Sequence, residues 1–191
     1  MAKSKAPRAL RRPVKAMPAL SVLLTASPVV EDYAAILQLL HKYCHVVDRG
    51  TVDQIVALFH HDATLLPRYE SAERYQGREA VRGWYERWIA ESRATVRHLR
   101  HTILAPVIEI AGNEATAVCY VDVDAIPVAT NKPWMARGRY EDKLIKEEGR
   151  WWFRERALIV YYTSSLAAYR EGWKRQGPRA KVQSRREGKT K

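Results

Sequence analysis

The sequence predicts an α+β protein in which helices come first and a curved antiparallel sheet follows. Between about residues 28 and 93, apolar residues recur at helical spacing. From residue 98 onward, four segments are rich in β-branched and aromatic residues. Gly-Asn, Asn-Lys-Pro and Glu-Gly turns separate these segments at regular intervals. This order predicts a meander of strands with the helices packed on one face of the sheet.

The first helix is predicted over residues 28–46. Ser27 is a favourable N-cap residue, and Pro28 is favourable at the first helical position. The triplet Asp48-Arg49-Gly50 is expected to end this helix. Its apolar face is predicted to be Val30, Ala34, Leu37, Leu40 and Cys44.

Two further helices and a short strand are predicted before the meander. Thr51 is expected to cap a short second helix, and residues 63–66 form a strand candidate that Pro67 ends. The third helix is predicted over residues 77–93. Its apolar face comprises Ala80, Val81, Trp84, Trp88 and Ile89. The four long strands are predicted over residues 98–110, 115–127, 134–146 and 151–164.

The chain carries a formal charge of +12, and this charge is unevenly distributed. Residues 1–28 carry +6, residues 173–191 carry +7, and the segment between them carries −1. We therefore expect a basic disordered arm over residues 1–27, one domain over 28–170 and a basic disordered tail over 171–191. A neutral folded part argues against a specific nucleic-acid partner, although the tails keep a weaker nucleic-acid or membrane-surface role open.

The composition also bears on the compartment. Two cysteines, Cys44 and Cys119, cannot form a disulfide framework, and no apolar run has the length of a membrane span. The apolar stretch 17–30 follows basic residues, but Pro18 and its shortness argue against a secretory segment. We expect a cytoplasmic protein without a membrane span.

Four sequence segments, in order along residues 29–160, resemble the SnoaL-like family within the NTF2-like superfamily. They are ILQLLHKYCHVVDRGTVDQIVALFHHDATL, GREAVRGWYERW, RHTILAPVIEIAGNEATA and ARGRYEDKLIKEEGRWWFRERAL. The resemblance implies a cone-shaped barrel in which a curved antiparallel sheet wraps around the N-terminal helices. It also implies a deep apolar cavity and a homodimer, which we expect to form through the outer face of strands 134–164. Members include polyketide cyclases, dehydratases, a dehydrochlorinase and a steroid isomerase, as well as non-catalytic proteins.

The same resemblance places three catalytic roles on this chain. A Tyr, an Asp and a His converge on the cavity in catalytic members, and they match Tyr43, Asp48 and His101. His101 would be the base, Asp48 would orient it, and Tyr43 would stabilise charge on a substrate oxygen. The physical chemistry agrees, because a carboxylate on the far ring nitrogen offsets the cost of a histidine cation in a dry pocket. Asp48 could also be only a turn residue, and Tyr43 a rim aromatic.

Other residues are candidates for substrate binding. His98 competes with His101, and the two would lie on opposite faces of a regular strand. Arg156 matches a cavity arginine of the dehydratases and could bind an anionic group or pair with a strand aspartate. Asp122 and Asp124 share one strand face that could point inward or outward. The substrate-binding candidates are Arg156, Asp124, Tyr69, Trp84 and His98.

A metal site is not expected. His41 and His45 have helical i, i+4 spacing, but no third ligand has a recognisable spacing. His60-His61-Asp62 is predicted to be a surface turn. We therefore expect a lyase or isomerase, without cofactor, that acts on a small apolar cyclic or aromatic compound. The alternative is a non-catalytic SnoaL-like binding protein or the small subunit of a ring-hydroxylating dioxygenase.

Overall fold

The computed structural model describes residues 27–70, 72–165 and 167–168. The elements are α1 (Pro28–Arg49), α2 (Val52–Val56), β1 (Phe59–Pro67), β2 (Tyr75–Gln76), α3 (Arg78–Glu91), the 3-10 turn η1 (Arg93–Thr95), β3 (Val96–Ala111), β4 (Glu114–Pro127), β5 (Trp134–Glu147) and β6 (Arg150–Ser165). The arm over 1–26 and the tail over 171–191 lie outside the described residues, so their predicted disorder stays a prediction. Among the described residues, no helix is long and apolar enough to cross a membrane.

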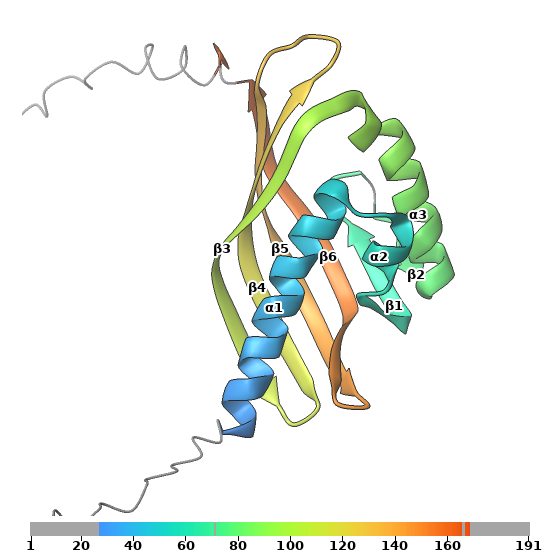
Figure 1. Cartoon of the computed structure of the whole chain (residues 1–191), viewed down its shortest axis with the longest axis vertical. Coiled ribbons are helices and arrows are strands. Elements are labelled where there is room, and N and C mark those ends of the chain that lie inside the picture. Colours follow the sequence, from blue (N-terminus) through green and yellow to red (C-terminus); the bar gives the residue numbers. More distant parts are fainter. Residues whose placement is uncertain (1–26, 71, 166, 169–191) are drawn as a thin grey trace, which may run out of the picture.

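The six strands form one curved sheet in the order β2-β1-β6-β5-β4-β3. Strands β3 to β6 form the predicted antiparallel meander, whereas β1 pairs with β6 in parallel. All three helices lie on the same side of this sheet, with α1 crossing in front of the long strands (Figure 1). The α+β class is confirmed, but the sheet stays open, because β2 and β3 are its edges and do not pair.

Helix α1 runs three residues beyond its predicted end, and its predicted apolar face is confirmed at Leu40 and Cys44 but not at its other three positions. Ser27 is its N-cap residue but makes no side-chain capping bond, and Pro28 occupies the first turn. Val30 and Ala34 are exposed and Leu37 is half-buried, so the predicted apolar stripe was wrong at these positions. The helix buries Ile36, Leu39, Leu40, Tyr43, Cys44 and Val47. These spacings follow the helical period, and the apolar residues beyond them are left on the solvent side.

Local sequence signals account for the other two helices. Thr51 accepts a hydrogen bond from the Gln54 amide, and the Gln54 side chain accepts one from the Thr51 amide. This reciprocal capping box satisfies two amides that the short helix α2 cannot satisfy internally. Helix α3 follows Gly77, whose φ of 84° is easy for glycine alone. It buries Val81, Trp84 and Tyr85.

Two bulges bend the long edge strand β3. Between Arg97 and Arg100, β3 advances three residues while β4 advances two, from Ile126 to Asp124. β3 therefore has one extra residue in this bulge, and His98, which lies within it, has a φ of 54°. A second bulge follows Leu104, where Ala105 has a φ of 47°. Such bulges increase the bend of a strand and shift which side chains face inward.

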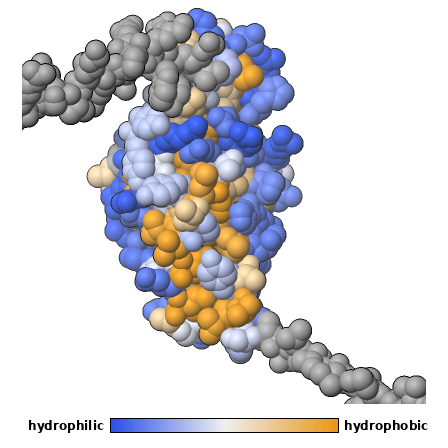
Figure 2. Space-filling model, turned by 90° about the vertical axis from the view of Figure 1, so that its left-hand side faces the viewer, coloured by the Kyte–Doolittle hydropathy of each residue, from blue (hydrophilic) through white to orange (hydrophobic). Residues whose placement is uncertain are grey.

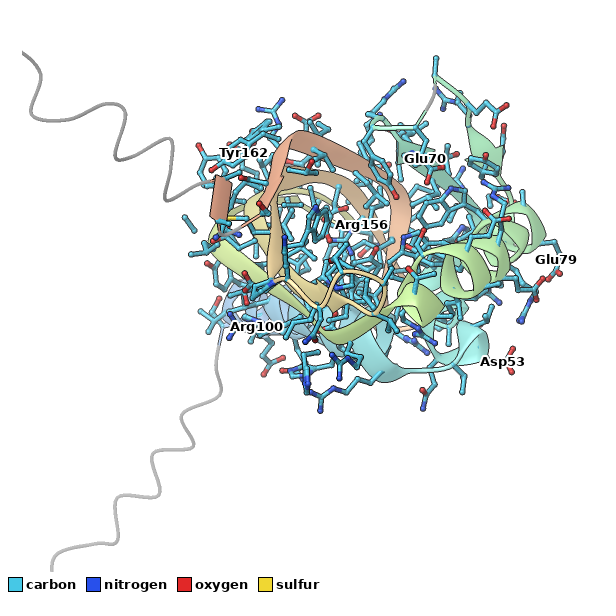
Figure 3. All side chains as sticks on the ribbon, turned by 90° about the horizontal axis from the view of Figure 1, so that it is seen from above. Asp53, Glu70, Glu79, Arg100, Arg156 and Tyr162 are labelled. Atoms are coloured by element: carbon cyan, nitrogen blue, oxygen red, sulfur yellow. The ribbon has the colours of Figure 1, made fainter. Side chains whose placement is uncertain are left out.

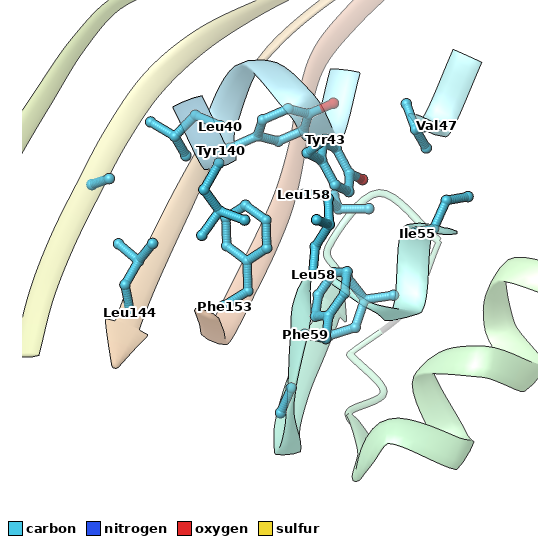
Figure 4. Packing of buried hydrophobic residues seen from close by; sticks show 14 of the residues in the cluster. Leu40, Tyr43, Val47, Ile55, Leu58, Phe59, Tyr140, Leu144, Phe153 and Leu158 are labelled. Carbon is cyan, nitrogen blue, oxygen red and sulfur yellow. The ribbon is translucent and has the colours of Figure 1, made fainter. Parts of the chain in front are cut away.

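The core lies between the helices and the concave face of the sheet. Figure 4 shows Tyr43 from α1 directed toward Tyr140 and Phe153 of the sheet. Phe59 from β1 packs against Phe153, with ring centroids 5.3 Å apart. Alternate residues of β4 face this core, including Ala115, Ala117, Cys119 and Val121.

Apolar side chains also gather on one outer face, which Figure 2 shows from the side of β3 and β4. Leu104 pairs with Tyr120 and Val107 with Val118, and all four are at least 42% exposed. This cluster lies on β3 and β4. Within the strands 134–164, where we expected a dimer contact, β6 also exposes Val160, Tyr161 and Tyr162. The homodimer itself stays a prediction.

Gly138 on β5 provides a test of how β5 and β6 fit together. A Cβ atom at this position would overlap the carbonyl oxygen of Ile159 on β6. Because that oxygen belongs to the backbone, Gly138→Ala should destabilise the protein by more than about 2 kcal/mol in urea denaturation. Gly83→Ala is the matched control, since nothing lies within 4 Å of that site on the exposed face of α3. It should stabilise by about 0.5–1 kcal/mol. Equal stability of the two variants would contradict the β5–β6 geometry.

Asp32 provides a pH-dependent test of how α1 is attached to the sheet. Its Oδ1 accepts hydrogen bonds from Lys146 Nζ at 2.6 Å and from Trp151 Nε1 at 2.8 Å. These bonds lower the carboxyl pKa below its ordinary value of 3.8, so their contribution is present above that pH and is lost as the pH falls through the folded-state pKa. Asp32→Asn should therefore lower the Tm at pH 7, and the difference should shrink below about pH 4. A difference in Tm that does not depend on pH would contradict this assignment.

Candidate functional site

A cavity of about 740 Å³ opens between α1, α3 and the concave face of the sheet. Eight of its lining side chains are aromatic: Tyr43, Tyr69, Trp84, Tyr85, Trp88, Trp134, Tyr140 and Tyr162. Val47, Val121 and Val123 add an aliphatic lining, and His101 is the only histidine among the described residues that line the cavity. A cavity of this size, lined mainly by aromatic and aliphatic side chains with a smaller number of polar groups, is typical of a site for a small organic molecule.

His101, which lines this cavity, contacts the side chain of Asp48. His101 Nδ1 lies 2.6 Å from Asp48 Oδ1, and both side chains are about nine-tenths buried. The backbone amide of His101 also donates to Oδ1 and Oδ2 of Asp48, at 3.2 and 3.1 Å. Three contacts therefore fix the last turn of α1 to the start of β3.

The contact restricts the tautomer of a neutral His101 ring. When Asp48 is ionised, its carboxylate can only accept, so Nδ1 of the neutral ring carries the proton and Nε2 keeps its lone pair. The ring centroid of His101 lies 6.5 Å from that of Trp88, another residue of the cavity wall. The contact with Asp48 thereby holds the imidazole in place at the wall of the cavity.

The bulge at His98 is the reason that His101 faces the cavity. In a strand without a bulge, the pairing of Arg97 with Ile126 would place His101 opposite Asp122. The extra residue places His101 opposite Val123 instead, and Val123 lines the cavity. The prediction that His98 and His101 lie on opposite faces assumed a regular strand, whereas β3 is irregular between them.

Tyr43 projects from α1 into the same cavity. Its hydroxyl lies 2.7 Å from that of Tyr85 on α3, and both residues are buried. Burial raises the pKa of Tyr43 to about 12, although the nearby Arg156 lowers it. Tyr43 is therefore a neutral hydrogen-bond donor at physiological pH.

Arg156 lies beneath the cavity and is fully buried. Figure 3 places it inside the curve of the sheet, and it is not among the residues that line the aromatic cavity. Its Nε and Nη2 donate to the two oxygens of Asp142 at 2.8 and 3.0 Å. Burial raises the pKa of Asp142, and the guanidinium acts in the opposite direction. Arg156 was expected either to bind an anionic group or to pair with a strand aspartate, and in the structure it pairs with Asp142 of β5.

The remaining predicted binding residues divide between two cavities. Tyr69 is 42% exposed and Trp84 is buried, and both line the aromatic cavity. Trp84 Nε1 also donates to Glu70 at 3.1 Å. Asp124 and His98 line a second cavity of about 760 Å³ beside α1 and β3, which Asp48 and His101 also line. Asp124 accepts a 2.6 Å hydrogen bond from Arg100 there.

His60 corrects the expectation that the segment 60–62 is a surface turn. It lies in β1 and is buried, while His61 and Asp62 are exposed. Together with Glu147, the two histidines form the one group with metal-ligand spacing in the described part of the chain. However, Nδ1 of His60 accepts from the Asp62 amide at 3.3 Å and faces the Arg154 guanidinium at 3.2 Å. A neutral ring then carries its proton on Nε2, 3.0 Å from Glu147, which does not suit metal ligation there.

Sequence reasoning missed several residues of the site. Tyr85 follows Val81 by four residues and could have been found from helical periodicity. Arg93 lines the cavity and donates to the carbonyls of Val47 and Gly50, which caps the end of α1 next to Asp48. No local pattern marks Arg93, because its role depends on where η1 meets α1.

Cys44 is buried, and burial raises its pKa to about 11, so it is a poor nucleophile.

Comparisons with known proteins place the chain in a family. The model of the SnoaL-like domain matches residues 28–157, and the chain belongs to this family. A comparison with curated protein sequences finds no significant match.

Solved structures share the fold at low sequence identity. A candidate scytalone dehydratase from Novosphingobium aromaticivorans is 21% identical with a TM-score of 0.62, over 71% of this chain and 88% of that one. A hexachlorocyclohexane dehydrochlorinase from Novosphingobium barchaimii is 17% identical with a TM-score of 0.62, over 73% and 92%. A candidate aromatic ring hydroxylase from N. aromaticivorans is 20% identical with a TM-score of 0.61, over 73% and 96%. At these identities the likeness establishes the NTF2-like fold.

Proposed function

We propose that the protein is a lyase or isomerase that uses acid–base chemistry without a cofactor on a small, neutral cyclic compound. The observation that carries this proposal is the Asp48–His101 pair, at 2.6 Å, beside an aromatic cavity of about 740 Å³. A purely structural subunit has no need to bury a carboxylate and an imidazole together at the wall of such a cavity. Family membership and the dehydratase and dehydrochlorinase neighbours also favour this class.

The proposed chemistry follows from the hydrogen-bond roles. Nε2 of His101 removes a proton from a carbon next to a carbonyl group, and the electrons of the broken C–H bond pass into a new C=C bond. In elimination, the leaving group departs with its bonding electrons; in isomerisation, His101 returns the proton to another carbon. Asp48 stabilises the imidazolium that forms. Tyr43 donates a hydrogen bond to the substrate oxygen as it gains negative charge.

The cavity favours a neutral ligand. Its arginine, Arg93, donates to two backbone carbonyls, and the deeper Arg156 is paired with Asp142. A carboxylate that entered this cavity would lose its hydration, which is costly, and would face both Glu91, which repels it, and Arg93, whose Nη1 already donates to two carbonyls. Flat rings, in contrast, can stack against Trp84, Trp88 and the surrounding tyrosines.

Substitutions at the pair test the mechanism. With 2-tetralone as a probe, α-hydrogen exchange in D₂O can be followed by proton NMR. His101→Ala and Asp48→Asn should each slow catalysed exchange about 10²- to 10⁴-fold, because the two residues act as a unit. Tyr43→Phe should cost less, because it removes one hydrogen bond and keeps the ring.

His98→Ala decides between the two histidines, since His98 lies outside the aromatic cavity. Loss of exchange in His98→Ala but not in His101→Ala would refute the assignment of the base. Unchanged exchange in all four variants would favour the non-catalytic binding protein.

Ligand charge provides a second test. 2-Acetylnaphthalene and 2-naphthoate share a ring system but differ in charge. The neutral ketone should bind at least about tenfold more tightly, because the carboxylate pays an uncompensated desolvation cost. Quenching of the fluorescence of Trp84, Trp88 and Trp134, which all line the cavity, measures both affinities. Equal or tighter binding of the carboxylate would assign the cavity to anionic ligands.

A further inference from the structure

Two phenol groups meet at the cavity wall. Tyr43 from α1 and Tyr85 from α3 both line the cavity, and their hydroxyl oxygens are 2.7 Å apart. One hydrogen bond between two hydroxyls uses only one of their two protons. The other hydroxyl proton is therefore available to a ligand in the cavity.

The buried cation of the core lies against one of these two rings. The guanidinium carbon of Arg156 is 3.8 Å from the ring centroid of Tyr43, with Phe153 and Tyr140 also within 4.4 Å. Arg156 is held there by both oxygens of Asp142. A fixed positive charge this close favours negative charge on the Tyr43 oxygen.

The pKa shifts of the two tyrosines also indicate that Tyr43 is the one that donates to an anionic oxygen. Burial raises the pKa of both residues, to about 12 for Tyr43 and well above its ordinary value for Tyr85. Arg156 is the foremost influence that lowers the pKa of Tyr43. Tyr43 is thus the better donor to an anionic oxygen, and Tyr85 is the better donor to Tyr43.

We propose that Tyr85 is a positioning residue that donates to Tyr43, so that Tyr43 directs its own proton at the substrate oxygen. The chain of hydrogen bonds then runs from Tyr85 to Tyr43 to the ligand, and each bond polarises the next. This chain of hydrogen bonds forms a donor site for an oxyanion. Tyr43 contacts the oxyanion directly, and Tyr85 on α3 supports Tyr43. This assignment rests on the proposed function, but it can be tested by binding alone.

The probe is 4-nitrophenol, whose ionisation when bound is read from the absorbance of its phenolate. The bound pKa is measured for the full-length wild type and for each variant, and the Tm verifies folding. Tyr43→Phe should raise the bound pKa by about one unit, because it removes a hydrogen bond to the charged form. Tyr85→Phe should raise it by roughly half a unit, because it removes only the supporting bond. In the Tyr43→Phe background, Tyr85→Phe should have no further effect.

Tyr140→Phe is the matched control. It also removes a phenol hydroxyl from the lining of the same cavity, next to Tyr43, but leaves the Tyr43–Tyr85 contact intact. It should change the bound pKa clearly less than Tyr85→Phe does. An equal effect of the two variants, or an undiminished effect of Tyr85→Phe without Tyr43, would overturn the proposal. Failure of the wild type to bind 4-nitrophenol would overturn it as well.

A second measurement does not depend on a variant that folds. In wild-type protein, a slowly exchanging hydroxyl proton of the buried pair should be visible by NMR and should move downfield when the phenolate binds. An unchanged signal in the bound state would count against the donor chain. If the 4-nitrophenol and NMR measurements contradict the donor chain while His101→Ala still slows α-hydrogen exchange, the proposed function stands and only the role of Tyr85 is lost.

Discussion

The buried ion pair between Arg156 and Asp142 is the interaction on which the rest of the site depends. It joins β5 to β6 within the core, and three aromatic rings surround its cation. Removing one partner from such a pair typically costs about 3–5 kcal/mol, because the other charge is left buried alone. The pair therefore fixes where Tyr43 packs, and Tyr43 in turn sets the position of α1 against the sheet. The ion pair that stabilises the core thus also places a positive charge next to Tyr43 at the cavity wall.

The placement of His101 depends on an irregularity and not on regular structure. The extra residue at His98 moves His101 from the outer to the inner face of β3, where the end of α1 brings Asp48 to meet it. The backbone amide of His101 bonds the same carboxylate, so the orientation of the ring and the docking of the strand are coupled. Bulges often occur beside active sites because they redirect one side chain without changing the fold.

Much of the fold could be predicted because local chemistry specifies it. Turn residues such as Glu148-Gly149, both with positive φ, set the limits of the strands, and the Thr51–Gln54 capping box set those of α2. The contact between Asp48 and His101 could be anticipated from family resemblance. The burial of Arg156, the bulge at His98 and the role of Arg93 could not, because each depends on which distant segment lies opposite. The buried face of α1 was assigned correctly at Leu40 and Cys44 but not in the first half of the helix, for the same reason.

The parallel pairing of β1 with β6 has a consequence for the kinetics of folding. Residues 64–67 pair with residues 155–158, so this contact closes a loop of about ninety residues. During synthesis, β1 emerges long before the strand that pairs with it in parallel. Contacts of such long sequence separation slow folding, because the entropy of loop closure must be lost before they form. One edge of β1 therefore stays without its partner strand until β6 is made, and in this interval the chain is most open to aggregation and to chaperones.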